Sequence, residues 1–197
     1  MVLEGHVMEK LPPPGTRIRN AFNGETFIFT HLDEDAELFQ LDVFLERGGM
    51  LRGTGRQHFH PNSDEEFHVR SGILRVMMDG KWYVLKAGDT LLVPRGIPHL
   101  FRNGHDGETL FRARFLPAHD FMRFFLNMSL GTANHPDWYD DNGEPSLVLR
   151  AQALHAFYGH AYGDGIPVWF QKLVFACLAP IAFLRGYRLS VKPRKRL

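Results

Sequence analysis

Cysteine is nearly absent from this sequence, because Cys177 is the single thiol among 197 residues. One thiol excludes an internal disulfide and a metal centre built from several thiolates, and it fits a reducing compartment. The first residues, MVLEGHVMEK, also lack the basic region and apolar run of a secretory signal. The sequence therefore predicts a cytoplasmic protein.

A strong excess of one charge is also missing. Lys and Arg number 23 and Asp and Glu 22, for a formal net charge of +1. Because no nucleic-acid-binding motif accompanies this balance, we predict no nucleic-acid partner. The charges are nevertheless unevenly placed: the last 13 residues hold six Lys or Arg and no acid, which leaves residues 1–184 at −5. The sequence thus predicts a mildly acidic body with a basic tail.

Short extended segments dominate the first 117 residues. Alternating and apolar stretches such as EEFHV, ILRVMM, KWYVL and TLLVP follow one another, separated by turns that contain Gly or Asp. This spacing is typical of an antiparallel sandwich or barrel. We expect an N-terminal arm over residues 1–16, stiffened by Pro12, Pro13 and Pro14, followed by an all-β core over residues 17–117.

Helical periodicity replaces the alternation after residue 117, so we expect a C-terminal α-helical extension over residues 118–197. Its helices are predicted at residues 118–130, at 146–163 with Ser146 as N-cap, and at 167–184 after Pro167. Residues 166–184 approach the length of a membrane span, but Gln171, Lys172 and Pro180 argue against a clean crossing. The alternatives are packing on the core or on a second copy, and peripheral membrane contact through this helix and the basic tail.

Two histidines one residue apart, His58 and His60, share one side of an extended strand, because strand side chains alternate with period two. A carboxylate follows at Glu65 and a third histidine at His99. Three imidazoles and one carboxylate suit a divalent first-row transition metal. Isolated histidines are more often ordinary polar residues, so the case for a metal rests on the spacing of all four.

That spacing is specific. His58-x-His60-x4-Glu65-x6-Gly72 is followed, after fifteen residues, by Gly88-x5-Pro94-x-Gly96-x2-His99-x3-Asn103. The two patterns resemble the two signature motifs of the cupin superfamily, and the first departs from its motif only in the position of its leading glycine. The resemblance covers roughly residues 17–117 and implies a cupin-type antiparallel β-barrel of the jelly-roll kind.

The resemblance also implies roles for single residues. His58, His60, Glu65 and His99 would be the metal ligands, and Gly72, Gly88 and Gly96 would form turns. Fe(II) is the metal that we expect, with Mn, Ni or Zn as alternatives, because availability decides among first-row ions at such a site. Glu65 is also the candidate catalytic residue, as a ligand able to accept a proton.

Alternation along the strands suggests which side chains meet a substrate. If Glu65 points into the barrel, Phe67 and Val69 share its side, and Phe101 shares the side of His99. Arg112 and Arg114 alternate with apolar neighbours, so an inward arginine would be a clamp for a substrate carboxylate. The alternative, which an apolar barrel core favours, places both arginines on the outer face.

These features favour an iron-dependent dioxygenase acting on a small apolar or aromatic organic substrate. One alternative is an oxygen-independent metal-dependent isomerase, decarboxylase or lyase, in which the metal acts as a Lewis acid. Another is a non-catalytic cupin that binds a small ligand. Because an exposed strand edge invites pairing, we also predict a homodimer.

Overall fold

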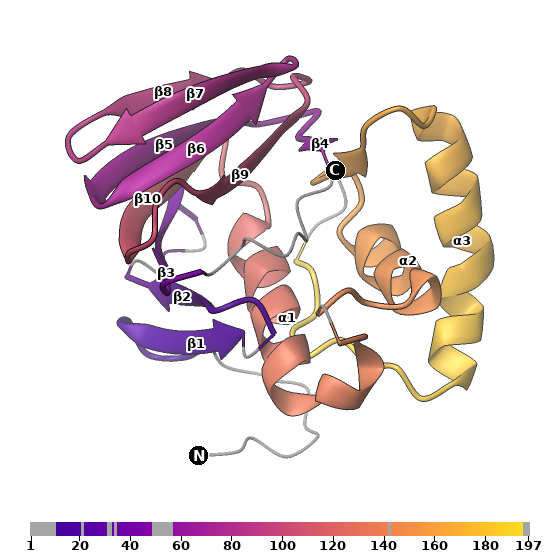
Figure 1. Cartoon of the computed structure of the whole chain (residues 1–197). Coiled ribbons are helices and arrows are strands. Elements are labelled where there is room, and N and C mark those ends of the chain that lie inside the picture. Colours follow the sequence, from indigo (N-terminus) through magenta and orange to yellow (C-terminus); the bar gives the residue numbers. More distant parts are fainter. Residues whose placement is uncertain are drawn as a thin grey trace.

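The computed structural model describes residues 11–20, 22–30, 33, 35–48, 57–141 and 143–194. Strands fill the first part of the chain and helices the last (Figure 1). Most of the predicted N-terminal arm, most of the loop at residues 47–55 and the end of the basic tail lie outside the described residues.

Eleven strands within the described ranges form two antiparallel sheets that face each other. The first sheet has the order β1-β2-β3-β10-β5-β8, and the second has the order β11-β4-β9-β6-β7. The strands are β1 (Thr16–Asn20), β2 (Glu25–Phe29), β3 (Phe39–Leu45), β4 (His58–Phe59), β5 (Asp64–Ser71), β6 (Ile73–Met78), β7 (Lys81–Lys86), β8 (Thr90–Val93), β9 (His99–Asn103), β10 (Thr109–Leu116) and β11 (Tyr162–Gly163).

Alternating residues of the central strands build the core between the sheets. Along β3 and β10 every second residue is buried, as in Leu41, Val43, Phe111 and Phe115, while the residues between them are partly exposed. This is the period of a strand with one face toward a core. The predicted all-β core with a helical extension is therefore confirmed.

Three α-helices follow the strands: α1 (Phe121–Asn134), α2 (Leu147–Ala156) and α3 (Val168–Leu184). The short 3₁₀ helix η1 (Pro136–Trp138) comes directly after α1. Helix α1 lies beside the strands, α2 lies next to α1, and α3 lies on the far side of α2 (Figure 1). The predicted starts of α2 and α3 are confirmed, because the Ser146 hydroxyl accepts the Leu149 N–H and α3 follows Pro167. The first helix, predicted at residues 118–130, begins at Phe121 and ends at Asn134.

The helix expected at residues 146–163 is shorter than predicted. It ends at Ala156, and Gly159 then adopts a φ of 82°, which belongs to the left-handed region that a helix does not use. Tyr162–Gly163 leaves the helical path altogether and pairs as β11 with β4. The end of the predicted helix is thus a strand that supports the histidine segment.

The residues that the structure describes contain no helix with the length and apolarity that a membrane crossing requires. Helix α3 has 17 residues and includes Pro180.

Candidate metal centre and cavity

Strand pairing brings the four predicted ligands to one end of the barrel. His58 on β4 lies directly opposite His99 on β9, and His60 follows two residues after His58. Glu65 comes from β5 in the other sheet, where it faces Phe115 on β10. Pairing of β4 with β9 thus brings together His58 and His99, which are 41 positions apart in the chain, and Glu65 reaches them from the other sheet.

One ligand atom from each of His58, His60, Glu65 and His99 lies within 4.8 Å of every other. The Glu65 Oε2 atom is 2.7 Å from His99 Nε2 and 3.2 Å from His60 Nε2. Two atoms about 2.1 Å from one ion, at right angles around it, are about 3 Å apart. The spacing thus fits adjacent ligands of one divalent transition-metal ion.

Backbone carbonyls fix the orientation of two of the rings. His60 Nδ1 lies 2.6 Å from the carbonyl oxygen of His160, and His99 Nδ1 lies 2.9 Å from that of Ile97. A carbonyl oxygen only accepts hydrogen bonds, so each Nδ1 is the protonated nitrogen. Each Nε2 then faces the Glu65 carboxylate, and this contact is satisfied by a proton on Nε2 or by a metal cation between the two atoms. This is the arrangement that outer hydrogen bonds give to metal-binding histidines.

The electrostatics of the buried groups agree with a cation site. Burial alone would raise the pKa of Glu65, but the neighbouring His99 and His60 lower it well below its ordinary value. Burial likewise opposes a charge on His99, yet the Glu65 carboxylate raises the pKa of that imidazole. The site therefore keeps its carboxylate ionised and attracts positive charge.

The turn after β5 shows why the first motif ends in glycine. Gly72 has a φ of 79°, and a Cβ atom there would lie 2.8 Å or less from Glu108 O and from Thr109 Oγ1 and Cα. A side chain would push β10 away from the β5–β6 turn. Asn103, the last residue of the second motif, donates to the carbonyl oxygens of Glu46 and Gly107 and so anchors a neighbouring loop.

A cavity of about 360 Å³ lies next to the four candidate ligands, and His58, His60 and Glu65 line one part of it. Its walls come from the inner face of the strands, from α1 and α2, and from the segment after α3. Most of these walls are apolar, as at Leu41, Phe111 and Phe124. A volume of this order suits a small organic ligand next to the metal.

The apolar residues expected at the cavity, Phe67, Val69 and Phe101, divide into two groups. Phe101 lines the cavity, with its ring centroid 5.1 Å from that of Phe111. Phe67 and Val69 are fully buried, and neither is among the described residues that line the cavity. Phe67 instead packs behind Phe101, at 5.7 Å between ring centroids. Phe101 is therefore the member of this group placed to touch a substrate.

Neither arginine faces the cavity, which corrects the expectation of an inward clamp. Arg112 Nε lies 2.7 Å from Asp42 on β3, and Arg114 Nη1 lies 2.8 Å from Glu66 on β5. The apolar neighbours Phe111 and Ala113 take the inward positions on β10. The structure thus has both arginines on the outer face, the alternative that an apolar core favours. The ion pair with Arg114 also places Glu66 on the outer face, away from the candidate metal site.

His160 supports the site in a way that its sequence position does not indicate. Its carbonyl oxygen holds His60, while its imidazole is 1% exposed, accepts the Asp120 N–H at Nε2 and contacts Phe157 O through Nδ1. Burial lowers the pKa of His160 to about 4, so the ring is neutral near pH 7. His160 thus links the helical extension to the candidate ligand His60 through its backbone.

Glu25 is a second buried carboxyl group in the cavity wall, and the sequence did not single it out. It lies on β2, is 6% exposed, and hydrogen bonds with Asn23. Burial raises its pKa from 4.5 to about 7. The Glu25 carboxyl group therefore changes between its protonated and ionised forms near pH 7.

Replacing Glu25 with glutamine should change the pH dependence of stability. The folded state holds the proton more tightly than the unfolded state, so the wild-type protein loses stability as pH rises from about 5 to 8, by on the order of 2–3 kcal/mol from this group. Urea unfolding of both proteins at pH 5 and pH 8 measures the difference. Equal changes in the unfolding free energy of the two proteins would contradict the assignment.

Comparison with known protein families agrees with this geometry. The sequence model of the cupin domain matches residues 50–112, a range that contains all four residues of the metal cluster. The part of the chain that matches this model, residues 50–112, is therefore identified as a cupin domain, and it carries the candidate metal site.

Curated relatives match over short segments. The chain is 38% identical over 52 residues to Protein SchB of Streptomyces halstedii and 40% identical over 52 residues to Polyketide synthase CurC of Streptomyces cyaneus. It is 41% identical over 58 residues to the uncharacterised protein YdbB of Bacillus subtilis. These segments make up 26%, 26% and 29% of this chain and span 38%, 34% and 51% of the three relatives.

Solved structures are similar over about half of the chain. KdgF from a Halomonas species is 23% identical, with a TM-score of 0.43, and the alignment covers 50% of this chain and 84% of that one. Pac13, described as a nucleoside dehydratase and solved from Streptomyces, is 16% identical, with a TM-score of 0.43 and coverage of 58% and 88%.

Proposed function

We propose that this chain is an iron(II)-dependent dioxygenase that acts on a small apolar or aromatic organic substrate. The observation that carries the proposal is the cluster of His58, His60, Glu65 and His99 at the edge of a largely apolar cavity. One carboxylate and three imidazoles would suit Fe(II), and a set of four protein ligands would leave coordination positions for substrate and oxygen. In the proposed reaction both atoms of O2 enter the substrate, which supplies all four electrons, so no external reductant is needed.

Bound iron would supply the redox chemistry between substrate and dioxygen. The protein side chains supply the remainder. Phe101, Phe111 and Leu41 exclude water from the cavity, which protects reactive species from hydrolysis. The Glu65 carboxylate, which stays ionised, would accept a hydrogen bond from a substrate hydroxyl and so orient it at the metal site.

One relative is named a polyketide synthase, and this name suggests a chemical class for the substrate. Polyketides carry ketone and phenol oxygens on an apolar carbon skeleton. Such oxygens bind a metal, and such a skeleton fits apolar walls. Phenols and diketones are therefore the first compounds to test.

Oxygen uptake by the iron-loaded protein, measured with a panel of phenols and diketones, tests the proposal. We expect consumption of oxygen with at least one compound and none with the iron-free protein. The zinc-loaded protein is the matched control, since zinc fills the same ligands without redox chemistry. Turnover under anaerobic conditions without any oxygen uptake would show a metal-dependent isomerase, decarboxylase or lyase instead. Binding of a compound without turnover in either atmosphere would show a ligand-binding cupin.

The homodimer and the cytoplasmic location stay predictions. Strands β7 and β8 lie at sheet edges, where backbone groups are free to pair with a second copy. We propose that two copies associate through such an edge.

A further inference from the structure

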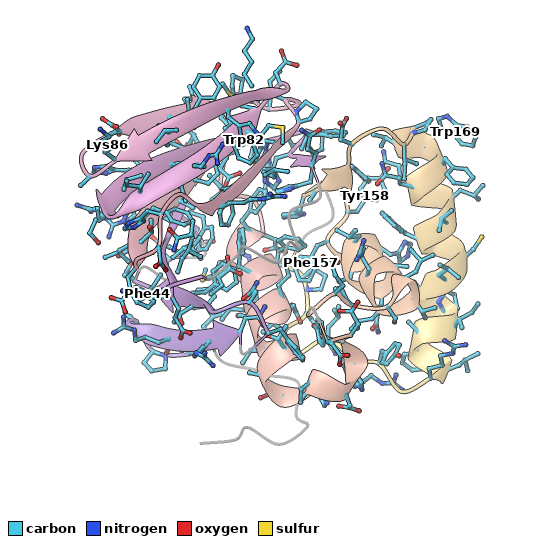
Figure 2. All side chains as sticks on the ribbon, viewed as in Figure 1. Phe44, Trp82, Lys86, Phe157, Tyr158 and Trp169 are labelled. Atoms are coloured by element: carbon cyan, nitrogen blue, oxygen red, sulfur yellow. The ribbon has the colours of Figure 1, made fainter. Side chains whose placement is uncertain are left out.

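Helix α3 presents a continuous apolar surface on its outer side. Figure 2 shows Trp169 at one end of this helix, directed away from the rest of the molecule. Its side chain is 67% exposed, and Leu184 at the other end is 84% exposed. The exposed residues of α3 are Trp169, Phe170, Leu173, Ala176, Cys177, Pro180, Ile181, Phe183 and Leu184. We call this set the outer face of α3; it contains no charged side chain and no amide.

The polar side chains of α3 are engaged elsewhere. Gln171 is buried, donates to the carbonyl oxygens of Gly163 and Ile166, and accepts the Gly163 N–H. The Lys172 ammonium lies over the ring of Tyr158 at 4.4 Å from its centroid. Phe175 and Ala182 pack inward. A helix that is apolar on its inner and outer sides needs a second apolar environment.

The chain around the outer face carries charge of one sign. Residues 165–197 hold seven Lys or Arg and no Asp or Glu. Arg185 and Arg188 follow the helix directly and are exposed. The Arg188 guanidinium sits 3.8 Å from the ring centroid of Phe183, so cationic and apolar groups meet at the end of the helix. This charge is complementary to an anionic surface.

We propose that α3 lies in the interface of a membrane that contains anionic lipids. The helix is about 25 Å long and would lie parallel to the membrane plane, with its outer face among the acyl chains. Arg185 and Arg188, at the end of the helix, would contact the lipid phosphates. Because the rest of the molecule lies on the other side of α2, the barrel would remain in water (Figure 1).

A lipid surface fits better than a second protein chain, for two reasons. Interfaces between proteins contain about one hydrogen bond per 100–200 Å², whereas the outer face of α3 offers no polar side chain to form one. Two copies that meet through parallel α3 helices would also bring Arg185 and Arg188 of both copies together, whereas anionic lipid neutralises these charges.

Flotation of the full-length protein with liposomes tests this proposal. We expect binding to vesicles of phosphatidylcholine and phosphatidylglycerol, and weak binding to phosphatidylcholine alone. Replacing Phe170 and Leu173 with serine should weaken binding about tenfold or more, because the apolar contact is lost. Replacing Arg185 and Arg188 with glutamine should weaken binding to the anionic vesicles about tenfold, because the cationic contacts at the end of the helix are lost.

Matched controls use the same substitutions on the barrel. Val84 and Leu92 are 56% and 54% exposed, and their change to serine should leave vesicle binding unaltered. Lys86 lies at the end of β7, remote from α3 (Figure 2). Lys86 and Lys81, the first residue of the same strand, serve as controls for charge. Equal losses in the control and α3 variants would overturn the proposal. Absence of vesicle binding would also overturn the proposal. This holds if the protein sediments as a monomer, and also if it sediments as a dimer that the serine variant of Phe170 and Leu173 dissociates.

Discussion

Replacing His60 with alanine should lower metal affinity about a hundredfold or more. The change removes one of four converging ligands and the ring that the His160 carbonyl holds in place. Loss of an outer hydrogen bond alone costs metal sites 10- to 100-fold in affinity, so we expect at least the upper end of that range. Protein purified without added metal, dialysed and analysed for iron, manganese, nickel and zinc gives the occupancy directly.

His68 provides the matched control for this experiment. It lies on the same strand as Glu65, but on the other side, opposite Arg112 and Thr90. Its change to alanine removes an imidazole of equal size without touching the cluster, so metal content should stay that of the wild type. A His60→Ala protein that keeps full metal content, or equal losses in both variants, would refute the ligand assignment.

The ligand cluster was predictable because its information is local. Period-two alternation places His58 and His60 on one side of the chain, and the spacing to the motif glycines sets where the adjacent strands turn. The structure then brings one ligand atom from each of the four residues within 4.8 Å of the others. What the motifs do not contain is the support from outside the barrel. The His160 carbonyl contacts His60 across 100 residues, and nothing in the sequence near either residue indicates it.

The orientation of Arg112 and Arg114 shows a different limit. Alternation along β10 determines that both arginines share one face, but it does not decide which face that is. The decision comes from acids on neighbouring strands: Asp42 on β3 and Glu66 on β5 pair with the two guanidinium groups. Two ion pairs on the outer surface and an apolar inner face satisfy both strands at once.

The same reasoning explains β11. A helical pattern continues through Ala156, and only pairing with β4 turns Tyr162–Gly163 into a strand. The side-chain amide of Gln171, near the start of α3, also accepts the Gly163 N–H and donates to the Gly163 carbonyl oxygen. Tertiary contacts of this kind outweigh local propensity and are invisible in a window of sequence.

Replacing Phe115 with alanine should destabilise the fold by about 3–5 kcal/mol, the usual cost of truncating a large buried aromatic side chain. Phe115 is fully buried at the end of β10 and stacks on Phe121 of α1, with 4.3 Å between ring centroids. It also contacts the ring of His60 edge-on at 5.4 Å. One side chain therefore joins the barrel, the first helix and a metal ligand.

Urea unfolding of the metal-free protein measures this cost, with Phe44→Ala as the control. Phe44 lies on β3, but on the partly exposed side of the strand, so the same truncation there leaves no closed cavity and should cost much less. If Phe115 couples the helices to the barrel, its loss should also weaken metal binding, because α1 and the His160 carbonyl position His60 together. A Phe115→Ala protein with the stability of the Phe44→Ala variant would mean that the helical extension packs on the barrel without this contact.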